Sequence, residues 1–279
     1  MSGEGLQGGE IPPMPGASEE PAPPGVAPPP PPLPTPRARP ADPWAHRRGE
    51  PRLFALGWTI YVLIAVAGSI LWVARFASVS AGSYGPAARI MLVVVALGAT
   101  VLWPMVRLSQ MSPRGSVVGH VLADVFVILL PIQFVLWPLV VLANWPLVIV
   151  AGVAAMIAAW VMLSGGLQAC ALSGAPVVEP RDPRLAARSL WMAVIVIAVG
   201  LGPMCSLGLA FANRPSPAWL PMISPLTGIP ALTGVGLSGP QGPISIGQWE
   251  SIGVVAAVGV VLWVVAWIRS ALGRTRRAA

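Results

Sequence analysis

Six stretches of this sequence are each long and apolar enough to cross a lipid bilayer as a helix. The hydrocarbon core is about 30 Å thick, and a helix needs about 20 residues to span it. Only 10% of the residues are charged, against about 25% in soluble domains. The sequence therefore predicts an all-α integral membrane protein with a bundle of six transmembrane helices in residues 53–269. The predicted spans are about 53–74, 88–107, 117–142, 146–168, 189–211 and 251–269.

The arginines are distributed unevenly around these spans, and this sets the predicted orientation. Arginine and lysine in short flanking segments are retained on the cytoplasmic side of a membrane. If the N-terminal tail is cytoplasmic, fourteen of the 17 basic residues lie inside and only Arg75, Arg89 and Arg214 lie outside. Both termini are therefore predicted to be cytoplasmic. All the basic residues are arginines, and with the abundant alanine, glycine and proline this favours a GC-rich bacterial source and an inner (plasma) membrane.

The formal net charge of +7 is also found in proteins that bind nucleic acid. Here the arginines flank apolar spans and do not alternate with aromatic residues along one helix face. The predicted partners are therefore the bilayer and its anionic lipids at the arginine-rich inner flanks, and no nucleic acid is expected.

The N-terminal 52 residues have a composition that does not support a packed domain. They contain 16 of the 33 prolines, and a proline-rich chain forms extended polyproline II structure. We expect a disordered cytoplasmic tail that serves either as a spacer or as a ligand for an aromatic groove of a partner. No apolar segment precedes residue 53, so no cleavable signal peptide is expected. Residues 270–279 form a second, basic cytoplasmic tail.

Residues 213–250 are nearly uncharged and contain a possible seventh span, "AWLPMISPLTGIPALTGVGL". Its three prolines would leave backbone groups unsatisfied in lipid, and a crossing there would move the basic C-terminus outside. The segment is therefore predicted to be a long external loop. A plain connecting loop is favoured over one that re-enters the protein.

The third span contains an acid, in "GHVLADVFVILLPIQFVLWPLVVL". At about 100° per residue, His120, Asp124, Pro131 and Pro138 lie within about 40° of one another on one helix face. This face should meet protein or water, because an acid in the bilayer costs about 2.5 kcal/mol or more. Two roles remain open for Asp124. It forms a structural ion pair with Arg107 of the preceding span, or it shares a titrating proton with His120.

Other irregularities lie in the second and fifth spans. Gly202 and Pro203 interrupt the fifth span, and Gly98 and Pro104 lie in the second. Interrupted helices at matching places in two halves are typical of transporters, although kinked membrane helices are common for other reasons.

Small residues that favour close helix packing form faces on the fourth and last spans, at Ala151, Ala155, Ala159, Gly253 and Ala257.

The sequence lacks the residues that most enzymatic mechanisms need. The sequence has no lysine, which excludes a GxxxxGK phosphate-binding loop and a lysine Schiff base. His120 is the only histidine in the predicted membrane region, so no metal site, no Ser/His relay and no cofactor is predicted. An intramembrane enzyme, the least favoured class, would need a water-filled pocket joining Asp124 to Cys170 or Ser164.

Three functions follow in order of preference. The first is a non-enzymatic subunit or accessory scaffold of a membrane complex, with partners held through small-residue helix faces and the proline-rich tail. The second is a small proton-linked transporter or channel that uses His120 and Asp124. The third is an intramembrane enzyme.

Overall fold

The computed structural model describes residues 51–75, 81–110, 116–173, 185–234 and 243–278, and their regular structure is entirely helical. Six helices in this part of the chain are long and apolar enough to cross a membrane. The prediction of an all-α fold with six candidate spans is confirmed, and the chain has the features of a multi-pass membrane protein. The predicted proline-rich tail lies, up to residue 50, outside the described residues.

The helices differ from the predicted windows at their ends, and two spans are divided. The last helix begins at Ile246 and continues through most of the predicted C-terminal tail to Ala278. The elements are α1 Pro51–Ala74, α2 Ala81–Leu97, η2 Gly98–Leu102, α3 Trp103–Ser109, α4 Val117–Leu136, α5 Leu139–Leu142, α6 Leu147–Leu172, α7 Leu185–Phe211, η3 Leu220–Ile223, α8 Pro225–Thr233 and α9 Ile246–Ala278.

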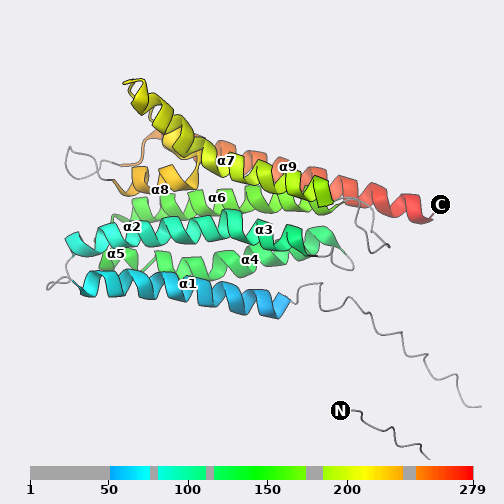
Figure 1. Ribbon diagram of the computed structural model, residues 1–279, viewed down its shortest axis with the longest axis horizontal. Coiled ribbons are helices and arrows are strands. Elements are labelled where there is room, and N and C mark those ends of the chain that lie inside the picture. The colour runs from blue at the N-terminus through cyan, green and yellow to red at the C-terminus, as the bar shows by residue number, and fades with distance from the viewer. Residues whose placement is uncertain (1–50, 76–80, 111–115, 174–184, 235–242, 279) are drawn as a thin grey trace, which may run out of the picture. The chain divides into compact units, whose positions relative to one another are not determined.

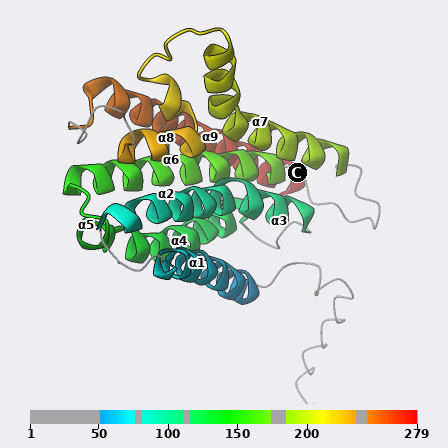
Figure 2. The same ribbon diagram turned by 60° about the vertical axis from the view of Figure 1, so that its left-hand side comes forward.

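The long helix α6 is the centre of the bundle. In the most apolar 18-residue stretch of α6, 67% of the residues are buried, whereas the share is 17% in the corresponding stretches of α1, α7 and α9. It packs against α4, α7, α8 and α9. Figures 1 and 2 show α1 at one edge of the bundle and α7 and α9 at the other. The outer helices therefore keep wide apolar faces that turn away from the protein.

Helices α6 and α9 approach closely at glycines. A Cβ atom on Gly259 would lie 3.1 Å from the backbone nitrogen of Leu163, and one on Gly166 would lie 3.1 Å from the carbonyl oxygen of Gly259. Small residues allow such contact between helix backbones. The face predicted for the last span differs, because Gly253 has open space around it and Ala257 is exposed.

The second span widens into the π-helical turn η2 directly before Pro104. Proline has no N–H group, and its ring collides with the carbonyl four residues earlier in a regular α-helix. In η2 the N–H of Trp103 instead bonds to the carbonyl of Gly98, five residues back, which is the wider π pattern. The turn therefore accommodates Pro104 without ending the span, and it changes which side chains of α3 face the bundle.

Residues 220–233 differ from the predicted plain loop. Two short helices, η3 and α8, pack against α2, α6 and α7, and Met222, Ile229 and Leu232 are almost completely buried. Pro221 and Pro225 stand in the first turns of these helices, where the missing N–H is harmless. In Figure 1, α8 lies at the end of the bundle opposite to the one where α9 ends. We call residues 220–233 the packed hairpin.

Candidate functional site

Asp124 and Arg107 form a buried ion pair between α4 and α3. The Nε atom of Arg107 lies 2.6 Å from Oδ2 of Asp124, and its Nη2 atom lies 2.5 Å from Oδ1. The side chain of Asp124 is only 8% exposed and that of Arg107 only 12%. Two parallel charge-assisted hydrogen bonds are the strongest geometry available to this pair. The structure thus brings together the two residues of the expected structural pair.

A cluster of side chains connects this ion pair to other helices. The ring of Phe54 in α1 lies 4.5 Å from the guanidinium carbon of Arg107. Nη1 of Arg107 donates to the side-chain oxygen of Gln110 at 2.9 Å, and Nη1 of the buried Arg188 donates to the carbonyl oxygen of Gln110 at 2.9 Å. The ion pair therefore couples α1, α3, α4 and α7 at one end of the bundle.

His120 stands apart from this pair. Its side chain is exposed, and its Nδ1 atom lies 2.8 Å from the carbonyl oxygen of Ser116 in the preceding turn. Among the described contacts, both carboxylate oxygens of Asp124 bond to Arg107. The helix positions allow His120 and Asp124 to meet, but the planar guanidinium group offers two donors to the carboxylate where the imidazole offers one.

The prolines of the third span lie in different surroundings. Pro131 stays inside α4, while Pro138 stands at the N-cap of α5, after the break that follows Leu136. Near Pro131, the indole Nε1 of Trp58 donates to the carbonyl oxygen of Ile128 at 3.2 Å. The carbonyl that Pro131 leaves without its usual helix donor is that of Val127, so the indole of Trp58 binds the carbonyl one residue beyond it.

The packed hairpin contacts α7 at Gly202 and Pro203. Pro203 cannot donate to the carbonyl of Val199 four residues earlier, and Oγ of Ser224 donates to that oxygen at 2.6 Å instead. A Cβ atom on Gly202 would collide with Cβ of Ser224 and Oγ1 of Thr227. The interruption in the fifth span therefore forms a docking place for another part of the same chain.

Arg89 stands out in the sequence only as an outer flanking charge, but the structure gives it specific partners. Its Nη2 atom donates to the carbonyl oxygens of Thr233 and Gly234 at 2.9 Å and 2.6 Å. These carbonyls belong to the C-terminal end of α8, where a cation is favoured. The sequence offered little signal for this contact, because Arg89 lies at the start of the predicted span 88–107 and is indistinguishable there from a flanking charge.

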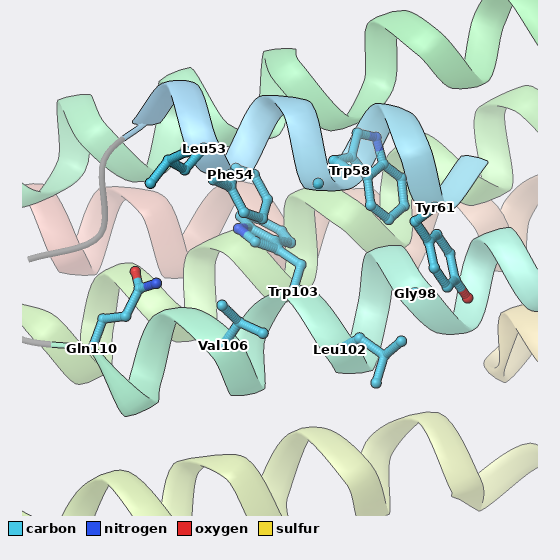
Figure 3. A pocket seen from close by; sticks show the side chains of 10 residues that line it. Leu53, Phe54, Trp58, Tyr61, Gly98, Leu102, Trp103, Val106 and Gln110 are labelled. Carbon is cyan, nitrogen blue, oxygen red and sulfur yellow. The ribbon is translucent and has the colours of Figure 1, made fainter. Parts of the chain in front are cut away.

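An apolar groove runs between α1 and the η2–α3 part of the second span (Figure 3). Its volume is about 610 Å³, within the usual range of about 300–1,000 Å³ for ligand pockets. It is lined by Leu53, Phe54, Gly57, Trp58, Tyr61, Gly98, Leu102, Trp103, Val106 and Gln110. Sequence reasoning missed this groove, because its two walls come from helices whose spacing no local pattern reveals.

Three buried side chains have polar groups without a hydrogen-bond partner among the described residues. They are the indole Nε1 atoms of Trp103 and Trp160, whose residues are 2% and 4% exposed, and the side-chain amide of Gln168, which is 0% exposed. Close by in sequence, Oγ of Ser164 donates weakly to the carbonyl of Thr100 at 3.4 Å. Within the described residues there is no group of three or more His, Cys, Asp or Glu side chains that could hold a metal ion.

No known family model, no curated protein and no solved structure matches this chain. Its function is therefore inferred from the geometry of its own residues.

Proposed function

We propose that this chain is a non-enzymatic subunit or accessory scaffold of a membrane complex. The observation that carries this proposal is the closed pair of Arg107 and Asp124, in which one guanidinium group binds both carboxylate oxygens. An acid held in this way joins two helices, since a buried charge without its partner is strongly unfavourable. The costly charged residues of the bundle then serve to fix helix positions.

The outer helices support the same proposal. The faces of α1, α7 and α9 carry many exposed apolar side chains, among them Leu63, Ile197 and Val261. Gly68, Gly208 and Gly253 on these helices are surrounded by open space, because a Cβ atom added to any of them would have no heavy atom within 4 Å. Such faces suit lipid or the helices of another membrane protein.

The proposed arrangement places both termini in the cytoplasm of a bacterial cell and the chain in the inner membrane. Support comes from the arginine distribution in the sequence and the tendency of basic flanks to stay inside. The first residue of α1 and the last of α9 lie at the same end of the bundle (Figure 1), as an even number of crossings requires. The basic flanks would contact anionic lipid, and the proline-rich tail would contact a cytoplasmic partner.

The scaffold proposal is tested by photo-crosslinking the full chain in membranes and then capturing the chain together with any crosslinked partner. The control variant has the five prolines at positions 28–32 replaced by glycine and serine, which removes the residues that favour polyproline II geometry but keeps the length. We expect one defined cytoplasmic partner to be crosslinked to the native chain and lost from the variant. Identical crosslinking patterns for both chains would count against the tail as a partner site.

A proton-linked transporter is the second candidate, and the buried amide of Gln168 favours it. A side chain that is 0% exposed and lacks a partner among the described residues is a place where a solute or water can bind inside the bundle. Liposome flux distinguishes the two functions. A transporter would show a pH-driven flux that Asp124→Asn or Gln168→Leu abolishes, whereas a scaffold shows no flux above that of empty liposomes.

A further inference from the structure

The packed hairpin reaches about the middle of the bundle. Its residue Ser224 bonds to the carbonyl oxygen of Val199, which lies near the middle of α7. A Cβ atom on Gly228 of α8 would collide with Sδ of Met156 in α6. Met156 follows the first residue of α6 by about 14 Å at 1.5 Å per residue. Residues 220–233 therefore fill one half of the bundle, from its end to about its centre.

The same side of α6 carries polar side chains in the other half of the bundle. Met156 is followed at intervals of four residues by Trp160, Ser164 and Gln168, and each interval turns the position by only about 40°. The indole Nε1 of Trp160 and both amide atoms of Gln168 have no partner among the described residues. Oγ of Ser164 makes only a long bond of 3.4 Å to the carbonyl oxygen of Thr100. We call Trp160, Ser164 and Gln168 the polar stripe.

The helix opposite Ser164 is irregular at the same level. Pro104 cannot donate to the carbonyl oxygen of Thr100 four residues earlier, so this oxygen depends on Ser164 for a donor. It belongs to the π-helical turn η2, and such turns are frequent at functional sites. Irregular backbone at membrane depth is tolerated where it is buried in protein or lines a water-filled cavity. Both sides of this interface therefore carry groups that water would satisfy.

The polar stripe is closed in the described arrangement. Ser164 is 1% exposed and Gln168 is 0% exposed, so water does not reach them there. Buried polar groups without partners are unfavourable in a low-dielectric interior, and hydration would remove this cost. The stripe thus favours opening of the interface between η2 and α6, while the apolar contacts around it favour closure. Opposing terms of this kind allow two populated states.

We infer that the bundle has a second, hydrated state, in which water reaches the polar stripe from the end where α9 ends. The entry is short, because Gln168 lies only about 6 Å before the end of α6. The packed hairpin seals the path toward the opposite end, and Arg89 holds this seal through the carbonyls of Thr233 and Gly234.

The chemistry of the stripe selects what the path accepts. An indole, a hydroxyl and an amide offer hydrogen bonds without a charge, so the path suits water and small uncharged solutes. The use of this path for transport rests on the second candidate function, the transporter. The hydrated state itself is measured without any flux.

Thiol labelling tests the hydrated state. Ser164→Cys places a thiol in the middle of the stripe with little change in size, and Cys205→Ala removes the partly exposed native thiol. Cys170 is the internal control, because it is 4% exposed and its Sγ atom bonds to the carbonyl of Leu262 in α9 at 3.3 Å. The full chain in sealed vesicles of known orientation receives a small membrane-impermeant thiosulfonate from either side. Peptide mass spectrometry then follows each cysteine separately.

We expect the introduced thiol to react at least about tenfold faster from the end where α9 ends than from the hairpin end, while Cys170 stays unlabelled. No reaction from either end would overturn the hydrated state. Equal labelling of Cys170 would show that the whole bundle opens and would overturn a defined path. Equal rates from the two ends would overturn the hairpin as a seal.

Arg89→Met tests the seal in the Ser164→Cys chain. It removes two charge-assisted bonds, so we expect labelling from the hairpin end to rise about tenfold or more, with labelling from the other end unchanged. Arg75→Met is the matched control and should leave both rates unchanged. An unchanged rate from the hairpin end in Arg89→Met would overturn the role of Arg89.

Gln168→Leu tests the stripe. It removes the amide that favours opening, so labelling of the introduced thiol from the end where α9 ends should slow about fivefold or more. A rate equal to that of the parent chain would overturn the stripe as the cause of opening. Labelling as expected without solute flux in liposomes would support the hydrated state and exclude the transporter, so the two failures are distinguishable.

Discussion

Ser224 donates a hydrogen bond from its Oγ atom to the carbonyl oxygen of Val199, at 2.6 Å. This is the oxygen that Pro203 leaves without its usual donor in α7. Ser224 is 0% exposed, and it also caps α8 by accepting from the N–H of Leu226. The irregular point of one helix and the start of another are therefore satisfied by a single side chain.

Ser224→Ala should lower the free energy of unfolding in detergent by about 1–3 kcal/mol, because it leaves the buried carbonyl of Val199 and the α8 N-terminus without partners. The measurement is equilibrium unfolding monitored by circular dichroism. Ser251→Ala serves as control, since its hydroxyl bonds to an exposed carbonyl of its own helix and its removal should change stability by less than about 0.5 kcal/mol. Equal effects of the two changes would contradict the role of Ser224.

Gly202→Ala should destabilise the protein by about 1–3 kcal/mol through overpacking. The added Cβ would collide with Ser224 and Thr227 of the packed hairpin. Gly208→Ala on the same helix has open space and should be neutral or stabilising by up to about 1 kcal/mol. The same unfolding measurement checks both variants, and a stabilising Gly202→Ala would mean that the hairpin does not dock on α7.

Asp124→Leu should cost about 3–5 kcal/mol of stability, because it leaves the guanidinium group of Arg107 buried without its partner. Combining it with Arg107→Met should recover a large part of this loss, since an apolar pair of similar volume carries no desolvation penalty. Arg107→Lys should not preserve the native stability, because an ammonium group cannot form the two parallel bonds. Strictly additive single and double variants would exclude direct coupling of the two residues.

Arg89→Met should loosen the packed hairpin without unfolding the bundle. It removes two charge-assisted bonds to Thr233 and Gly234, each worth about 1.5–3 kcal/mol. Hydrogen exchange of the backbone amides in α8 should become faster, while exchange in α6 stays slow. Arg75→Met is the control, because the side chain of Arg75 is exposed and its described contact is with the ring of Trp72. Unchanged exchange in α8 would show that the cap is dispensable.

The positions of Arg107 and Asp124 illustrate what local sequence can predict. The two residues lie near the facing ends of consecutive spans joined by a short connection, so an antiparallel hairpin brings them together whatever the other helices do. The six spans were predictable for a related reason, since length and hydrophobicity act within each segment alone. Helix ends were less accurate, as the extension of α9 to Ala278 shows.

The packed hairpin and the groove could not be predicted in the same way. The sequence alone determined the apolar spans and the arginine asymmetry, because each depends on residues within one segment. It also brought Arg107 and Asp124 near each other, since they lie in two adjacent segments, but it left open whether Asp124 pairs with Arg107 or shares a proton with His120. Only the tertiary structure decided that Ser224 bonds to Val199, that Arg89 caps α8, and that α1 and α3 leave a groove. These contacts join segments far apart in the chain, and their geometry depends on packing among several helices at once.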